Sequence, residues 1–273
     1  MRVRTWNLNH GNSVPPGARS LLRAMVELIA AGEPSVICLQ EVPAWALGSL
    51  GGWAAMKEVP ARATRPHAGP LPAPAAVGKL LSTPHSGRLS AAFTGAGNSI
   101  LIPAAASIRD VKTVTLNTNV FCEERGAALG LSRKQMRAWE RKRRICHLVH
   151  YELPNRRRYL VATLQTTSYP SDTRLADAEL RRAVGFVDRH AEVEETVIVA
   201  GDFNLTRAQS QTIAELESAA PEFRWTDRGA RIEDVLLRGA VASSARRWSD
   251  EERTRSGRLL SDHAPVEVEL EER

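Results

Sequence analysis

The sequence predicts an α/β fold, with packed β-sheets flanked by helices in a single domain over residues 1–273. Two observations lead to this prediction. Expected strands outnumber expected helices, and many strands are uninterrupted apolar runs, which is typical of strands buried on both faces. Residues 197–199, in the stretch VIVAGDFNLT, are such a run. A hydrophobic content of 43% is ample for a core of this kind.

Apolar periodicity and turn residues assign the elements in order. Strands are expected at residues 2–8, 35–40, 98–104, 111–122, 145–153, 158–165, 196–200, 232–239 and 264–270. Helices are expected over residues 17–31, 132–144, 174–190 and 207–217. The 132–144 helix belongs to a basic helical insertion near residues 123–144. Residues 60–88, rich in Pro, Gly and Ala, predict a long surface loop.

Composition and charge limit the function classes. The net charge is 37 − 31 = +6, which suits an anionic partner. Three cysteines without paired spacing favour reduced core thiols in a cytoplasmic protein over disulfides or a zinc site. No apolar run has the length of a membrane span, so we expect no membrane association. No obligate protein partner is evident.

Polar side chains recur where the expected buried strands end. The residues at these ends are Asn7, Asn9, Glu41, Asp202, Asn204, Asp262 and His263. In isolation, each could serve a turn. If the sheets bring these strand ends together, carboxylates, amides and one imidazole converge. Hard oxygen ligands of this kind suit Mg²⁺ or Mn²⁺, which can bind a substrate phosphate while a carboxylate takes a proton from water.

Four motifs in order, TWNLNHG, LQEV, GDFN and LSDHAP, make the chain resemble the endonuclease/exonuclease/phosphatase superfamily. The resemblance extends from Asn7 to His263. It implies a four-layer α-β-β-α sandwich, with two mixed β-sheets packed face to face and helices outside. It also implies a Mg²⁺- or Mn²⁺-dependent phosphodiesterase.

The resemblance assigns roles to individual residues. Glu41 would be the main metal ligand, with Asn7 close by, and Asp262 would complete the metal side or the hydrogen-bond network. Asp202 would orient or deprotonate the attacking water, and Asn204 would hold that aspartate and the phosphate. His263 would donate a hydrogen bond to the phosphoryl oxygen. Glu233 stands where the family usually has an aspartate that pairs with this histidine.

One position departs from the family. Gln165 stands where members usually have a histidine or tyrosine that acts on the leaving group. A glutamine can hydrogen-bond a phosphate oxygen but cannot deliver a proton, which leaves metal-bound water or Tyr169 for that step. Four further residues are interpreted as structural: His10 as a loop residue, His147 and His150 as strand residues, and Trp139 as a helix anchor rather than a base-stacking platform.

Basic residues favour a nucleic-acid substrate, DNA first and RNA second. They form two clusters: Arg133, Lys134, Arg137, Arg141, Lys142, Arg143 and Arg144, and then Arg156, Arg157 and Arg158 at the nearby hairpin. A groove of this charge would bind a polyanionic backbone. The alternatives are a solvated basic face, a phosphoesterase acting on a lipid or inositol phosphate, and a nucleic-acid-binding member with weakened catalysis.

Overall fold

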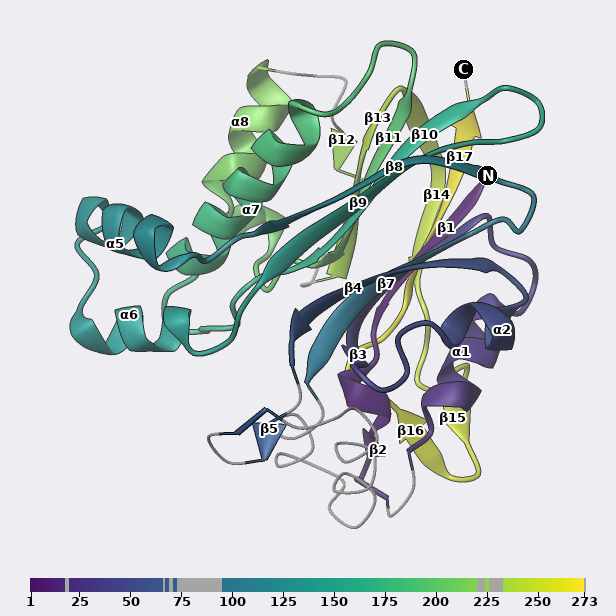
Figure 1. Cartoon of the computed structure of the whole chain (residues 1–273), viewed down its shortest axis with the longest axis horizontal. Helices are drawn as coiled ribbons and strands as arrows, with labels where there is room; N and C mark the ends of the chain where they lie inside the picture. The colour runs from purple at the N-terminus through teal and green to yellow at the C-terminus, as the bar shows by residue number, and fades with distance from the viewer. Residues whose placement is uncertain are drawn as a thin grey trace. The chain divides into compact units, whose positions relative to one another are not determined.

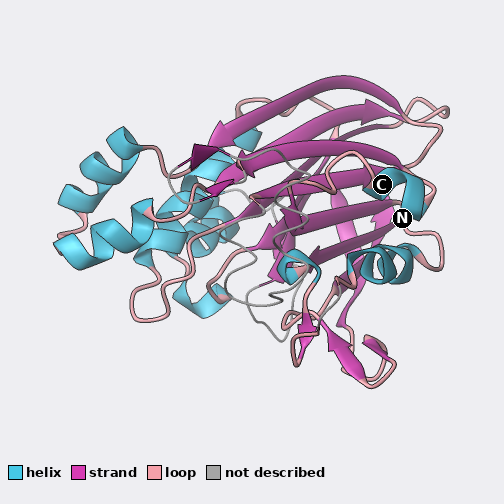
Figure 2. Ribbon diagram, turned by 60° about the horizontal axis from the view of Figure 1, so that its bottom comes forward, coloured by secondary structure: helices cyan, strands magenta, loops and turns pink. Residues whose placement is uncertain are grey.

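The computed structural model describes residues 1–17, 20–65, 67–68, 71–72, 95–219, 224–225 and 233–272. The chain divides into two compact units. The first comprises residues 1–106 and 244–270, and the second comprises residues 107–243 and 271–273. Each unit is built around one six-stranded mixed sheet (Figure 1). Figure 2 shows the twist of the strands from a second direction.

The sheet of the first unit has the order β14-β17-β1-β3-β7-β4. Its strands are β1 (Arg2–Asn7), β3 (Val36–Pro43), β4 (Lys57–Thr64), β7 (Ala96–Ile102), β14 (Ala240–Arg247) and β17 (Val266–Glu272). The helices α1 (Leu22–Ala30) and α2 (Leu50–Ala54) pack on it through a core that includes Trp6, Met25 and Leu39. The shorter elements are η1 (Asn9–Gly11), β2 (Ser13–Val14), β15 (Thr254–Arg255) and β16 (Arg258–Leu260), with the separate pair β5 (His67–Ala68) and β6 (Leu71–Pro72).

The sheet of the second unit has the order β12-β13-β11-β10-β9-β8. Its strands are β8 (Ser107–Thr115), β9 (Ile145–Glu152), β10 (Arg158–Gln165), β11 (Thr196–Asp202), β12 (Arg224–Trp225) and β13 (Glu233–Arg238). Its helical elements are α5 (Asn119–Ala128), α6 (Arg133–Glu140), α7 (Arg174–Asp188), η2 (Arg207–Gln209) and α8 (Gln211–Ala219). Side chains of α7 such as Leu180 pack against Leu160 of β10 and Val199 of β11.

Each sheet contains a parallel pair of strands that carries predicted site residues at its carboxyl end. In the first unit β1 runs parallel to β3, with Asn7 opposite Gln40. In the second unit β10 runs parallel to β11, with Gln165 opposite Asp202. Because parallel strands end at the same edge, their terminal side chains lie side by side, as is usual for sites in α/β proteins.

Most predicted elements are present with shifted ends, and the α/β class with mixed sheets is confirmed. Leu180 and Val187 are fully buried on α7 and Val184 is nearly so, as its helical spacing predicts. The strand expected at 196–200 continues to Asp202, so this aspartate is part of the ladder rather than of the following turn. The helix expected over 207–217 is split into η2 and α8.

Two predictions about segments are wrong. The strand expected over 111–122 ends at Thr115, and its last residues begin α5 instead. The Thr118 side chain caps that helix by accepting a hydrogen bond from the backbone N–H of Phe121, which the apolar pattern alone does not indicate. The loop expected over 60–88 begins only after β4, and most of its remainder lies outside the described residues.

The three cysteines are buried free thiols, as expected. Burial raises the pKa of the Cys146 thiol to about 12, so this thiol is protonated and unreactive near neutral pH. Among the described residues, no helix is both long and apolar enough to cross a membrane.

Candidate functional site

The predicted site residues fall into two groups, one in each unit. In the first unit, Asn7 is buried at the end of β1. Its side-chain oxygen accepts a hydrogen bond of 3.0 Å from the backbone N–H of Asn9. This contact is an Asx turn, which reverses the chain directly after the strand. Asn9 therefore contributes its backbone to the turn, while the Asn7 amide stays at the strand end.

Glu41 lies at an irregularity in β3. The register with β7 shifts between Leu39 and Val42, and Glu41 has a positive φ of 52°. A bulge of this kind turns a side chain out of the regular alternation and is common beside functional sites. The side chain of Glu41 is 16% exposed, and one of its oxygens lies 3.3 Å from Nε2 of His10.

Sequence reasoning passed over His10 as a loop residue, but the structure buries it against Glu41. His10 has a φ of 55° inside the short η1 element, and this conformation folds the loop back toward β3. The sequence contains one signal for this contact, the closeness of His10 to Asn7 within TWNLNHG. Histidine is enriched in the left-handed region, as Asn and Asp are, but the residue type alone does not predict this conformation at a given position.

The loop before β17 is tied to the end of β1 by Ser261. The Ser261 hydroxyl donates to the carbonyl of Asn7 at 2.7 Å and accepts from the N–H of His263 at 3.1 Å. Trp6 Nε1 also donates to the carbonyl of His263, at 2.8 Å. The backbone of His263 is thereby fixed relative to Asn7 within this unit. The carboxylate of Asp262 is more than half exposed and lies 3.8 Å from Nε2 of His263.

In the second unit, Gln165 and Asp202 are joined directly. Gln165 Nε2 donates to one carboxylate oxygen of Asp202 at 3.1 Å. The other oxygen accepts from the backbone N–H of Asn204 at 3.3 Å. Asp202 is 1% exposed and Gln165 is 9% exposed. The aspartate is therefore held by at least one donor on each of its two oxygens.

Asn204 and Glu233 flank this aspartate. Asn204 has a φ of 51°, and its side-chain amide donates to the carbonyl of Thr166 at 3.0 Å. The residue at position 233 faces Asp202 across the β11–β13 ladder. The structure thus brings Gln165, Asp202, Asn204 and the backbone of Glu233 to one edge of the sheet.

Gly201 is required by the neighbouring strand. A Cβ atom at this position would lie 2.0 Å from the carbonyl oxygen of Leu164, its register partner on β10. A glycine at the end of a strand can serve a bend or a close approach of the backbone to a ligand. The structure shows that it permits close pairing of β10 and β11 immediately before Gln165 and Asp202.

The basic residues separate into three environments. Arg144 is buried and donates from Nη1 to Oε1 of Gln165 at 2.6 Å. The others of the first cluster are exposed, on α6 or just after it: Arg133, Lys134, Arg137, Arg141, Lys142 and Arg143. Within the described part of the chain, no carboxylate forms an ion pair with any of these six.

The hairpin arginines lie elsewhere, so the expectation that their cluster is near the first is wrong. The hairpin joins β9 and β10 at one end of their ladder, and Gln165 lies at the other end. At about 3.3 Å per residue, the separation along β10 is roughly 23 Å. Arg156 pairs with Glu152, and Arg158 pairs with Glu192 and Glu194. Their charges are therefore partly neutralised.

Trp139 is a helix anchor, as its position predicted. It is fully buried, and its Nε1 donates to Glu179 at 2.7 Å. Glu179 also accepts from the backbone N–H and hydroxyl of Thr167. Burial raises the pKa of the Glu179 carboxyl to about 7, while the charge of Arg144 and these donors act in the opposite direction. Tyr169 is partly buried and packs against the apolar cluster formed by Cys122, Trp139, Leu175 and Ala178.

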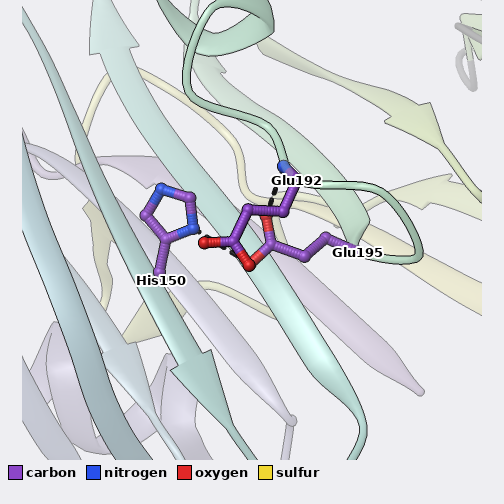
Figure 3. A group of neighbouring side chains, drawn as sticks. All are labelled: His150, Glu192 and Glu195. Atoms are coloured by element: carbon purple, nitrogen blue, oxygen red, sulfur yellow. Dashed lines mark hydrogen bonds and ion pairs between the residues drawn. The ribbon is translucent and has the colours of Figure 1, made fainter.

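His150, Glu192 and Glu195 form a group whose potential ligand atoms lie within 4.8 Å of one another (Figure 3). His150 Nδ1 is 2.9 Å from Glu195, whose other oxygen accepts the N–H of Glu192. Glu192 is in turn paired with Arg109 and Arg158. Because two guanidinium groups already supply the positive charge, a cation would have to displace them, and we interpret this group as an ion-pair network. It lies at the end of β11 opposite to Asp202.

The donor chemistry of the first unit fits a divalent cation better. Glu41 offers a partly exposed carboxylate, Asn7 an amide oxygen and Asp262 an exposed carboxylate, all of them hard oxygen ligands. Mg²⁺ and Mn²⁺ prefer such ligands and keep several waters, so few protein ligands are needed. The residues predicted to hold a cation are therefore of the right type.

Comparison with solved structures shows the fold. The endonuclease/exonuclease/phosphatase from Bacteroides vulgatus is 12% identical, with a TM-score of 0.70, over 100% of this chain and 99% of that one. The mannosyl-6-phosphatase Bt3783 of Bacteroides thetaiotaomicron is 12% identical, with a TM-score of 0.66, over 99% of each chain. The human nocturnin catalytic domain, solved with a bound sulfate anion, is 13% identical, with a TM-score of 0.65, over 99% of this chain and 94% of that one.

Sequence comparison shows the family. A comparison with curated protein sequences gives no significant match. The family model of the endonuclease/exonuclease/phosphatase family, however, matches residues 5–263, which include every strand-end residue named above. The chain therefore belongs to the endonuclease/exonuclease/phosphatase family of hydrolytic phosphoesterases.

Proposed function

We propose that this chain is a divalent-cation-dependent nuclease that hydrolyses phosphodiester bonds in DNA, with RNA as the next substrate class. The observation that carries the choice of a nucleic acid is the row of exposed cations on and after α6. Six basic side chains there have no carboxylate partner among the described residues. Unneutralised cations on one segment favour binding to a phosphate backbone by counterion release.

The proposed chemistry is in-line attack by water on a phosphodiester. Glu41 would hold the cation, together with Asn7 and Asp262. When bound, Mg²⁺ or Mn²⁺ supplies charge neutralisation and orientation of the phosphate. Asp202 orients the attacking water and accepts its proton on a carboxylate oxygen.

The remaining residues hold the reacting groups. Asn204 positions Asp202 through its backbone N–H and donates from its side chain to the phosphate. His263 donates a hydrogen bond to a phosphoryl oxygen, which stabilises charge that develops in the transition state. Glu233 takes the position of the aspartate that usually supports the histidine. Gln165 cannot protonate the leaving oxygen, because a glutamine amide does not titrate. When the phosphorus–oxygen bond to the leaving group breaks, the departing oxygen therefore takes its proton from a water molecule.

A phosphoesterase acting on a small phosphorylated molecule is the second candidate. Its support is the similarity in fold to a protein described as a mannosyl-6-phosphatase. Fold similarity alone does not select a substrate within a superfamily. For such a substrate, the exposed cations near α6 would be only a solvated surface.

A substrate panel separates these functions. The purified chain is incubated with plasmid DNA, single-stranded DNA, RNA, a phosphoinositide, sphingomyelin and a sugar phosphate, each with Mg²⁺, Mn²⁺ or EDTA. The proposal predicts metal-dependent cleavage of DNA that is faster than turnover of any lipid or sugar phosphate. Turnover of the sugar phosphate with intact DNA would establish the second candidate instead.

A further inference from the structure

We propose that Arg144 is a positioning residue that acts on Asp202 through the side chain of Gln165. This inference rests on the proposed function, because it names the group that orients the proposed base. The three side chains form one chain of hydrogen bonds. Arg144 Nη1 donates to Gln165 Oε1 at 2.6 Å, and Gln165 Nε2 donates to Asp202 Oδ2 at 3.1 Å.

The direction of this chain follows from the chemistry of its members. A guanidinium only donates hydrogen bonds, and an ionised carboxylate only accepts them. The amide between them must therefore turn its oxygen toward Arg144 and its nitrogen toward Asp202. A glutamine without Arg144 could rotate its amide or leave the carboxylate. Arg144 thereby makes one of two amide orientations the favourable one.

Arg144 is itself fixed by the backbone around it. Its N–H donates to Oδ1 of Asn117 at 2.7 Å, and its carbonyl accepts from the N–H of Leu116 at 2.8 Å. The Asn117 amide nitrogen donates to the carbonyls of Trp139 and Lys142 at 2.8 and 2.7 Å. These bonds hold residue 144 at the start of β9, beside the end of β10. Replacing the arginine side chain leaves all of them in place.

The burial of Arg144 indicates that its guanidinium has a specific task. It is 8% exposed, and its Nε atom has no hydrogen-bond partner among the described residues. Burying a guanidinium that lacks full hydrogen bonding is costly, and an exposed position would avoid this cost. Its neighbour Arg143 shows the alternative, since it is exposed and donates to Thr115 Oγ1.

In this arrangement, Gln165 has a different task from the histidine or tyrosine that family members usually have at this position. Both ends of its amide are engaged by protein groups, Arg144 at the oxygen and Asp202 at the nitrogen. It therefore orients the proposed base rather than serving the leaving group. Errors of about 1 Å in the position of a catalytic group can cost on the order of 100-fold in rate.

The test is a double-mutant cycle of Arg144→Met and Gln165→Leu, measured by DNA cleavage. Each single variant should lower kcat about 10- to 100-fold with little change in KM. The double variant should be no slower than the slower single variant, because both remove the same connection. Arg189→Met, which removes an exposed arginine at the end of α7, is the control and should retain wild-type kcat. Multiplied losses in the double variant, or a raised KM with unchanged kcat, would overturn the proposal.

A second measurement does not depend on activity. In ¹⁵N-labelled protein, the Gln165 side-chain amide signal is assigned by its loss in Gln165→Leu. Arg144→Met should shift this signal and speed its hydrogen exchange, whereas Arg143→Met should leave it unchanged. An unchanged signal in Arg144→Met would refute the positioning role. If the wild type cleaves no substrate, the proposed function fails, while this measurement still decides the role of Arg144.

Discussion

The Nε2 atom of His10 lies 3.3 Å from a carboxylate oxygen of Glu41 within the first unit. Both residues have positive φ values, 55° and 52°. Two strained residues in contact at the end of a parallel strand pair indicate a geometry maintained for function. We expect His10 to fix the orientation of the Glu41 carboxylate, as groups hydrogen-bonded to metal ligands commonly do.

His10→Ala should therefore weaken Mn²⁺ binding on the order of 10- to 100-fold, while Glu41→Gln should weaken it further. The reason is that the histidine only orients the ligand, whereas the glutamate supplies its charge. Titration calorimetry with Mn²⁺ measures both variants. His150→Ala, in the ion-pair network of the second unit, is the control and should keep wild-type affinity. If His150→Ala loses Mn²⁺ affinity while His10→Ala and Glu41→Gln keep it, the cation site lies at His150 instead.

Ser261→Ala should destabilise the fold by about 1–3 kcal/mol, because it leaves the buried carbonyl of Asn7 and N–H of His263 without this partner. Urea denaturation gives the free energy of unfolding. Ser256→Ala is a suitable comparison, since Ser256 also has a positive φ but is exposed. Equal stability of the two variants would show that the Ser261 hydroxyl does not hold the loop.

Gly201→Ala should lower both stability and activity, since the new Cβ would meet the Leu164 carbonyl at 2.0 Å. The strands must separate there, next to the Gln165–Asp202 contact. Gly52→Ala, where the added atom meets nothing within 4 Å, is the control. Thermal unfolding and cleavage assays check both. Wild-type behaviour of Gly201→Ala would mean that the ladder is not closely paired at this point.

The Glu179 carboxyl should make stability depend on pH. Its pKa is raised by burial from 4.5 in the unfolded chain to about 7 in the folded one. The folded state therefore binds more protons between these values, and stability falls as pH rises from about 4.5 to 7. The total change attributable to this group is about 3 kcal/mol. In Glu179→Gln this part of the pH slope should vanish, which urea denaturation at several pH values measures. An unchanged slope would assign the dependence to other groups.

Replacing Arg137 and Arg141 with Gln should weaken DNA binding and reduce the slope of log K against log salt by about 0.9 for each lost phosphate contact. The matched control removes the same charge from Arg156 and Arg157, at the other end of β10 from Gln165. Fluorescence anisotropy at several salt concentrations compares the two pairs. Equal slopes for both pairs would mean that the exposed cations near α6 are not a specific DNA contact.

The sequence predicted those features that depend on patterns within a single segment. Apolar runs located the strands, and strand-end motifs located Asp202 and Glu41. The contacts of Arg144, His10 and Ser261 could not be predicted in the same way. Each joins segments far apart in sequence or depends on a left-handed backbone conformation, as at His10 and Ser261. Arg144 also stands in a run of exposed basic residues, and only the register of β9 and β10 separates it from them.

The most direct test of the proposed function is plasmid cleavage by the wild type and by Asp202→Asn, with Mg²⁺ and with EDTA. The wild type should cleave DNA with Mg²⁺ and lose this activity with EDTA. Asp202→Asn should be slower by about two to four orders of magnitude, because an amide cannot accept the proton of water. DNA affinity should stay close to that of the wild type. Cleavage by Asp202→Asn at the wild-type rate, or cleavage by the wild type in EDTA, would contradict the mechanism.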